Sequence, residues 1–143
     1  MTIYIDENIP HHLAESLDIL QSHENLRLLE LNMDTIEVKS IIKEFERGIK
    51  DEEWIPKAGA QGACVITRDK NIQNLRHQRE LYQKHSLGLF FLHAESKKHG
   101  LSFWDMVESI IKHWPEIAKH ALKEERPFAF RFHKLGKQLE EMK

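Results

Sequence analysis

The sequence predicts an α/β fold with a mostly parallel central sheet flanked by helices. Short apolar runs of strand length alternate along the chain with longer segments of helical periodicity. The runs at 63–67 and 88–92 are almost continuously apolar, as in central strands that helices cover on both faces. Strands that alternate with helices are joined by right-handed crossovers, which makes neighbouring strands parallel.

The size and charge of the chain set limits on its class. Its 143 residues are most simply one domain, and we expect that domain to span 1–135, followed by a polar C-terminal tail at 136–143. The 41% of hydrophobic and 31% of charged residues are ordinary for a soluble globular protein. The formal net charge is −2, so any contact with nucleic acid requires a local basic patch.

Thiol chemistry, zinc binding and membrane insertion are not indicated. Cys64 is the only cysteine and lies within an apolar run, so we expect a buried hydrophobe. The ten histidines show none of the helical spacings of zinc ligands. No apolar run approaches the roughly 20 residues that span a bilayer, and residues 1–6 lack the features of a signal peptide. We therefore expect a cytoplasmic protein with no membrane partner.

The N-terminal segment predicts a strand followed by a helix. Residues 2–5 are β-branched and aromatic and predict a short buried strand, which Asp6 follows directly. Pro10 suits the first turn of a helix. The leucines of that helix recur at intervals of four and three, which predicts one apolar face made by Leu13, Leu17 and Leu20.

The following segment predicts a second strand and a second helix. Residues 26–31 (L-R-L-L-E-L) predict the strand. Residues 34–37 match a capping-box pattern, which predicts a helix that ends at Gly48. Val38 and Ile41 suit extended chain equally well, so both conformations stay open for this part of the chain.

Residues 51–70 predict a helix that leads into a strand. Asp51 opens the helix, and Pro56 is early enough in it to be tolerated. The residues expected to pack inward are Trp54, Ile55 and Ala58. The strand at 63–67 runs directly into Arg68, Asp69 and Lys70.

The remainder of the chain continues the alternation of helix and strand. A polar helix is expected over 71–85 and a buried strand over 88–92. Another helix is expected to begin at Ser102 and to restart at Pro115. The period-two phenylalanines of 128–132 predict a late strand at a sheet edge.

Three aspartates are expected to meet at one edge of the sheet. Asp6 and Asp69 each follow a predicted strand, and the ends of neighbouring parallel strands lie about 4.8 Å apart. Asp51 begins a helix that returns from the same edge. Carboxylates this close repel one another and raise each other's pKa, and a divalent cation relieves that repulsion. The sequence therefore predicts a site for a hard divalent cation such as Mg²⁺, made by these three residues.

Ordinary structural roles also account for each aspartate taken singly. An aspartate after a strand often forms a turn, and Asp51 with Glu52 and Glu53 suits a helix N-terminus. Only the set of three at one edge favours a metal site. The basic residues that flank two of these carboxylates are predicted to contact a phosphate backbone: Lys50, Arg68 and Lys70.

Four stretches of the sequence carry a family resemblance. They are I-D-E-N-I-P at 5–10, D-E-E-W-I-P at 51–56, V-I-T-R-D-K at 65–70 and G-L-F-F-L at 88–92. Together they resemble the PIN and PIN-like nucleases, in a compact form related to VapC-type toxins. The resemblance implies a three-layer PIN-like fold and Mg²⁺- or Mn²⁺-dependent cleavage of RNA. The clustered catalytic and metal-binding aspartates of that family would correspond to Asp6, Asp51 and Asp69.

The resemblance also implies a fourth acidic residue. Family members with a full acidic quartet carry a helical glutamate between the first two aspartates. Glu37 and Glu44 lie in the right interval, whereas Glu7 and Glu52 are adjacent to matched positions. Glu52 is the candidate included in the predicted metal site.

These observations predict a metal-dependent endoribonuclease that hydrolyses RNA phosphodiester bonds as the toxin of a toxin–antitoxin pair. Its expected partners are RNA and an antitoxin protein, with homodimerisation as a trait of the resembled toxins. The alternative is a catalytically silent PIN-like domain that binds RNA or protein. A phosphatase or receiver-like domain agrees less well, because a receiver requires paired acids after the first strand.

Overall fold

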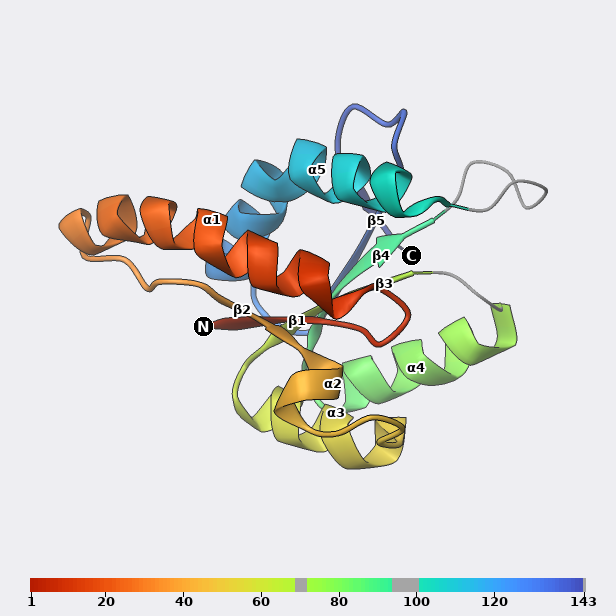
Figure 1. Cartoon of the computed structure of the whole chain (residues 1–143). Coiled ribbons are helices and arrows are strands. Elements are labelled where there is room, and N and C mark those ends of the chain that lie inside the picture. Colours follow the sequence, from red (N-terminus) through yellow and green to blue (C-terminus); the bar gives the residue numbers. More distant parts are fainter. Residues whose placement is uncertain (69–71, 94–100, 143) are drawn as a thin grey trace.

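The computed structural model describes residues 1–68, 72–93 and 101–142, with only the backbone of 72–75 (Figure 1). Two of the predicted site residues, Asp69 and Lys70, lie outside the described residues. Among the helices of the described part, none has the length and hydropathy of a bilayer span.

The fold is a six-stranded sheet in the order β2-β1-β3-β4-β5-β6, between two layers of helices. The strands are β1 (Thr2–Ile5), β2 (Glu37–Ser40), β3 (Cys64–Arg68), β4 (Gly88–Leu92), β5 (Phe128–Phe132) and β6 (Glu140–Glu141). The helices are α1 (His11–Glu30), α2 (Ile41–Glu44), α3 (Asp51–Ala60), α4 (Ile72–Lys84) and α5 (Phe103–Lys123). All neighbours pair in parallel except β5 and β6. The predicted three-layer α/β fold is confirmed.

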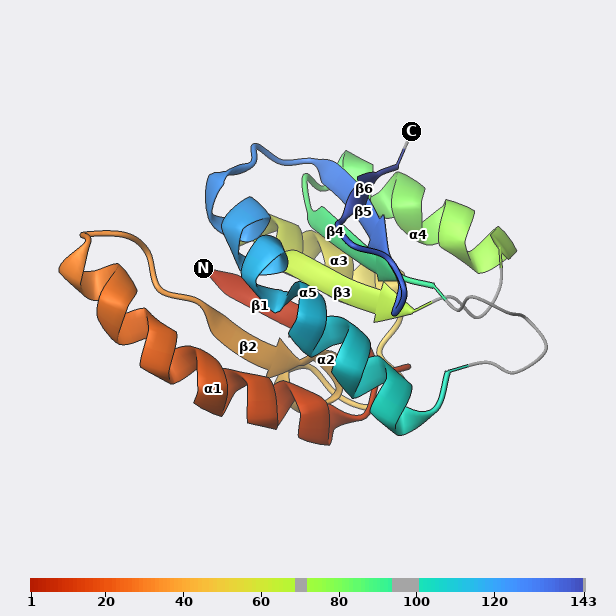
Figure 2. The same cartoon turned by 90° about the horizontal axis from the view of Figure 1, so that it is seen from above.

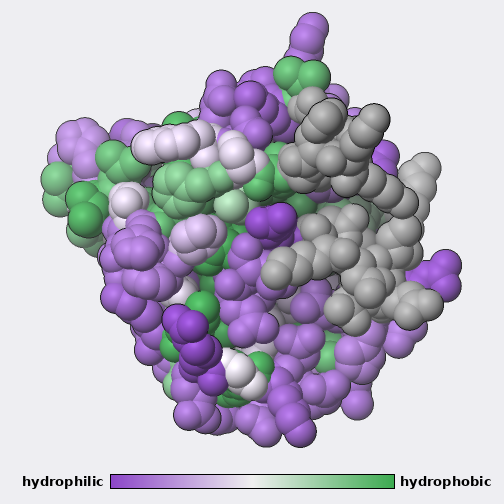
Figure 3. Space-filling view, turned by 45° about the vertical axis from the view of Figure 1, so that its right-hand side comes forward, coloured by the Kyte–Doolittle hydropathy of each residue, from purple (hydrophilic) through white to green (hydrophobic). Residues whose placement is uncertain are grey.

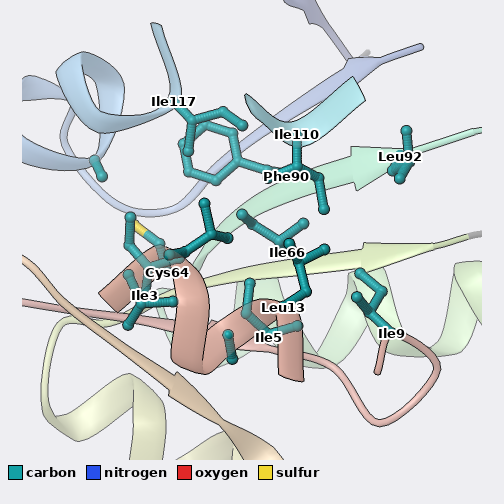
Figure 4. Packing of buried hydrophobic residues seen from close by; sticks show 14 of the residues in the cluster. Ile3, Ile5, Ile9, Leu13, Cys64, Ile66, Phe90, Leu92, Ile110 and Ile117 are labelled. Carbon is teal, nitrogen blue, oxygen red and sulfur yellow. The ribbon is translucent and has the colours of Figure 1, made fainter. Parts of the chain in front are cut away.

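The two faces of the sheet bury separate apolar clusters. Helices α1 and α5 cover one face, where Ile66 and Phe90 pack against Leu13 and Ile110 (Figure 4). Helices α2, α3 and α4 cover the other face (Figures 1 and 2). The predicted inward residues of α3 are all buried there: Trp54, Ile55 and Ala58. Because side chains alternate along a strand, β1 and β3 contribute to both clusters.

The pairing of β1 with β3 places the two strand ends side by side, as the sequence predicts. The register pairs Ile5 with Ile66, and the Asp6 amide donates to the Ile66 carbonyl at 3.0 Å. The residue after β1 therefore lies beside the last residues of β3. This contact fixes the position of Asp6 at the carboxyl edge of the sheet.

The second strand predicted at 26–31 is wrong, because these residues complete α1. No glycine or proline interrupts 11–30, so nothing stops the helix before Glu30. Leu28 is buried, whereas Leu26, Leu29 and Leu31 are exposed large hydrophobic residues. The strand was predicted because the exposed leucines at the end of this helix give its sequence an apolar pattern like that of a strand.

The helix predicted over 34–48 is mostly wrong, because its first half is the strand β2 and only α2 is helical. The extended alternative is the one the chain adopts. Parallel pairing with β1 accounts for this choice, and α1 supports the strand. The Asp18 carboxylate accepts from the Val38 amide at 2.9 Å, and the Asn25 side chain bonds both backbone groups of Ile36.

Two further differences concern the C-terminal part. Helix α5 passes through Pro115 without restarting, because Ile110, Ile117 and Ala121 keep both halves on one buried face. Strand β5 is not at the edge of the sheet, because β6 pairs with it. The segment expected to be a polar tail thus supplies β6 and the buried Leu139.

Candidate active site

Asp6 is a buried carboxylate held by three hydrogen bonds. Its residue is only 3% exposed. Oδ1 accepts from the Glu7 amide at 2.8 Å, and Oδ2 accepts from Asn8 Nδ2 at 3.1 Å and from Thr67 Oγ1 at 2.7 Å. The donors come from the turn after β1 and from β3, so two separate segments of the chain fix this carboxylate.

The environment of Asp6 disfavours the ionised form of its carboxyl group, because the residue is buried and has acidic neighbours. Burial raises the pKa of Asp6, while the hydrogen bonds from Thr67 and the Glu7 amide oppose that rise. The negative charge of Asp51 raises the pKa of Asp6 further, followed by that of Glu7. The structure therefore brings Asp6 and Asp51 within electrostatic range of each other.

Asp51 is the first residue of α3 and is held from two helices. Its Oδ1 accepts from Trp54 Nε1 at 3.0 Å, one turn further along α3. Its Oδ2 accepts from Gln78 Nε2 on α4 at 3.3 Å. An indole and a carboxamide are both neutral donors, so they orient the carboxylate without cancelling its charge.

Glu52 is adjacent to Asp51 but bonds a different partner. It is 58% exposed at the side chain, and its Oε1 lies 2.8 Å from His77 Nε2 on α4. This contact lowers the pKa of Glu52 and raises the pKa of His77. To bind a metal ion with Asp51, Glu52 would have to release His77.

The other candidates for a fourth acid divide between the two ends of the sheet. Glu37 pairs in register with Thr2 at the start of the parallel strands, so it lies at the edge opposite Asp6. Glu44 forms an ion pair with Lys39, as Glu37 does. Glu7 is exposed beside Asp6. Glu7 and Glu52 are therefore the glutamates that adjoin the described aspartates.

The predicted basic residues are positioned differently. Lys50 is exposed and immediately precedes α3. Arg68 ends β3 on the face opposite Thr67, and its Nη1 donates to Met106 Sδ on α5 at 3.6 Å. Its Nε is buried and has no hydrogen-bond partner within the described residues. Arg68 thus lies against α5, on the side of the sheet away from Asp51.

Sequence reasoning missed three side chains that hold the two aspartates: Thr67, Trp54 and Gln78. The sequence predicts Thr67 only as a strand residue, because its contact with Asp6 depends on the register that pairs residue 5 with residue 66. The indole donor was available from spacing, since Trp54 lies three residues after Asp51. Nothing in the sequence around Gln78 indicates its contact with Asp51.

Comparison with known proteins identifies the family. A family model described as a PIN-like domain matches residues 1–94, which hold both aspartates and the first four strands. The chain belongs to the PIN-like domain family. PIN-like domains are generally nucleases, so membership assigns nuclease-type ancestry to this domain.

The other comparisons add little about the site of this PIN-like domain. The chain is 27% identical over 111 residues to GTPase Der of Leuconostoc citreum (strain KM20), which covers 76% of the chain. The chain spans only 25% of the length of that protein. The sequence of the PIN-like chain itself contains no G-x-x-x-x-G-K-[ST] phosphate-binding loop. No solved structure matches the chain.

The donor set of the PIN-like domain fits a hard divalent cation. A carboxylate has about four lone-pair sites, of which Asp6 uses three and Asp51 uses two. Both aspartates therefore retain capacity to bind a cation. Within the described ranges no three His, Cys, Asp or Glu side chains form a metal-binding group. Mg²⁺ needs only one or two carboxylates, since water and phosphate supply its other ligands.

Proposed function

We propose that this PIN-like domain is a metal-dependent endoribonuclease, with Mg²⁺ or Mn²⁺ as its cofactor and RNA as its substrate. The observation that supports this proposal best is the buried Asp6 carboxylate at the carboxyl edge of a parallel sheet, within electrostatic range of Asp51. The family of the chain supports the reaction class.

In the proposed mechanism, Asp6 and Asp51 bind the cation through their free lone pairs, and Asp69 is the third ligand. The chemistry that a divalent cation would supply there is the activation of water and the neutralisation of charge that develops on the phosphodiester. Thr67 keeps Asp6 aimed at the site, and Trp54 does the same for Asp51.

The remaining predicted residues belong to the periphery of the proposed site. Lys50, Arg68 and Lys70 contact the RNA backbone, which requires Arg68 to turn from Met106. Glu52 completes the ligand set when His77 releases it.

Substitution of the two aspartates tests the proposal. We expect Asp6→Asn and Asp51→Asn each to reduce Mn²⁺-dependent cleavage of single-stranded RNA by about 100-fold or more, because each removes an anionic ligand. The matched control is Asp34→Asn, which makes the same change at an exposed position just before β2. The cleavage rates of all four purified proteins are compared after circular dichroism has established folding.

Two results would contradict the assignment. If Asp51→Asn cleaved RNA at the wild-type rate, Asp51 would not belong to the active site. RNA binding without any metal-dependent cleavage by the wild type would support the alternative, a catalytically silent PIN-like domain that binds RNA or protein.

We further propose that the domain is the toxin of a toxin–antitoxin pair, on the basis of its resemblance to VapC-type toxins. Induced expression in a bacterial host is expected to arrest growth, and Asp51→Asn is expected to abolish the arrest. Co-expression of a small open reading frame adjacent to the gene should restore growth. Equal growth with wild type and Asp51→Asn would contradict the toxin role and leave the nuclease assay unaffected.

A further inference from the structure

Tyr82 carries a buried hydroxyl for which the described part of the chain supplies no partner. The residue lies on α4, is 2% exposed, and packs its ring against Trp54 with the centroids 6.1 Å apart. Within the described residues its hydroxyl makes no hydrogen bond. A buried polar group without a partner is costly and is therefore rare in folded proteins. The hydroxyl calls for a functional explanation.

Tyr82 adjoins the two side chains that hold Asp51. Gln78 precedes Tyr82 by one turn on the same side of α4 and donates to Asp51. Trp54, which contacts the Tyr82 ring, donates to the other oxygen of Asp51. After burial, the charges of Asp6 and then Asp51 raise the pKa of Tyr82, so both carboxylates lie within electrostatic range of the phenol.

Tyr4 provides a contrast within the same apolar cluster. It is also fully buried, but its hydroxyl donates to Gln61 Oε1 at 2.7 Å. The fold therefore pairs one of its two buried tyrosine hydroxyls inside the protein. The hydroxyl of the other, Tyr82, makes no hydrogen bond within the described residues.

We propose that Tyr82 is a positioning residue of the metal site, whose hydroxyl would donate a hydrogen bond to a water molecule held there with the cation. Ionised carboxylates only accept, so the water would donate its protons to them. Its oxygen would then accept the hydrogen bond from the phenol. Partners that orient the ligands of a metal ion typically contribute 10- to 100-fold to its affinity. This inference rests on the proposed metal-dependent function.

The variants Tyr82→Phe and Tyr4→Phe separate this role from a structural one. Both remove one buried hydroxyl from the same cluster and keep the ring. We expect Tyr82→Phe to have an unchanged or higher Tm than wild type in EDTA, because it deletes an unbonded group. We expect it to weaken Mn²⁺ binding by about tenfold or more, measured by calorimetry without RNA. Tyr4→Phe should lower the Tm in EDTA by about 3–5 °C and leave Mn²⁺ affinity unchanged.

The possible failures are distinguishable from one another. If Tyr82→Phe lowers the metal-free Tm as Tyr4→Phe does, or binds Mn²⁺ as tightly as wild type, the role of Tyr82 is overturned. Loss of Mn²⁺ binding in Asp51→Asn would then still uphold the proposed function. If the wild type itself binds no Mn²⁺, the proposed function fails and the assignment of Tyr82 fails with it.

Discussion

At the residue scale, the buried Asp6 carboxylate depends on a single side-chain hydroxyl from the neighbouring strand. Thr67 is fully buried and makes the shortest of the three hydrogen bonds to Asp6. Among the contacts that lower the pKa of Asp6, this bond is the largest. Threonine rather than valine at this position of β3 therefore opposes the rise that burial causes in the pKa of Asp6.

The variant Thr67→Val tests this dependence while preserving side-chain shape. Loss of the hydroxyl is expected to raise the pKa of Asp6 further, because burial and the charge of Asp51 are then less opposed. The acidic limb of the pH–rate profile of RNA cleavage should move to higher pH, and cleavage at neutral pH should fall by about tenfold. An acidic limb that does not move would contradict the role of Thr67.

The same raised pKa determines how the metal-free fold responds to pH. The pKa of Asp6 in the folded protein lies above its usual value, so the unfolded chain releases this proton at lower pH than the folded one. The contribution of Asp6 to stability is therefore lost as pH rises from the usual aspartate pKa through the folded one. Bound cation acts in the opposite direction, because it favours the ionised carboxylate.

At the element scale, α1 is connected to the central layer by polar contacts as well as by its leucines. The buried Gln21 accepts from Trp114 Nε1 of α5 at 2.8 Å and donates to Asn25 Oδ1 at 3.0 Å. Asn25 in turn bonds both the amide and the carbonyl of Ile36, at 3.0 and 2.9 Å. A chain of side-chain bonds therefore runs from α5 through α1 to the segment that enters β2.

The variant Asn25→Ala is expected to lower the free energy of unfolding by about 2–3 kcal/mol, since it leaves both backbone groups of buried Ile36 without these partners. Urea denaturation measures the change, with an m-value expected to stay constant. His23→Ala, at an exposed position of the same helix, is the control and should change stability little. Equal stability of the two variants would show that water replaces the Asn25 contacts.

This connection also explains why the second strand could not be located from the sequence. Residues 37–40 have no strong strand pattern of their own, and they become a strand because β1 pairs with them and α1 bonds the chain beside them. Residues 26–31 have apolar residues of strand-like spacing, yet the uninterrupted helix before them continues. Contacts distant in sequence thus decide the conformation of residues 37–40, and continuation of the preceding helix decides that of residues 26–30.

At the scale of the whole molecule, the architecture was predictable because its central strands are apolar on both faces. The apolar runs predict β1, β3 and β4, and the helices between them predict a mostly parallel sheet. The place of Asp6 at the carboxyl edge follows from its position directly after β1. The side chains that orient Asp6 and Asp51 could not be predicted, because Thr67 and Gln78 reach the aspartates only after distant segments have packed.

The surface of the molecule is consistent with its low net charge. Figure 3 shows a largely hydrophilic face with scattered hydrophobic patches. Several large hydrophobic residues of α1 are exposed, namely Ile19, Leu20, Leu26 and Leu29. Apolar side chains scattered singly over a surface are common, so only their number on one helix is unusual.

The insertion of β1 between β2 and β3 has a consequence for how the chain emerges from the ribosome. Asp6 is synthesised before its partners in β3, yet its amide bonds Ile66 and its carboxylate bonds Thr67. A nascent chain that ends before β3 contains the first aspartate without either contact. The order of translation thus delays assembly of the acidic site until more than 60 residues separate Asp6 from the growing end. An unfinished copy of the protein lacks the oriented carboxylate on which the proposed chemistry depends.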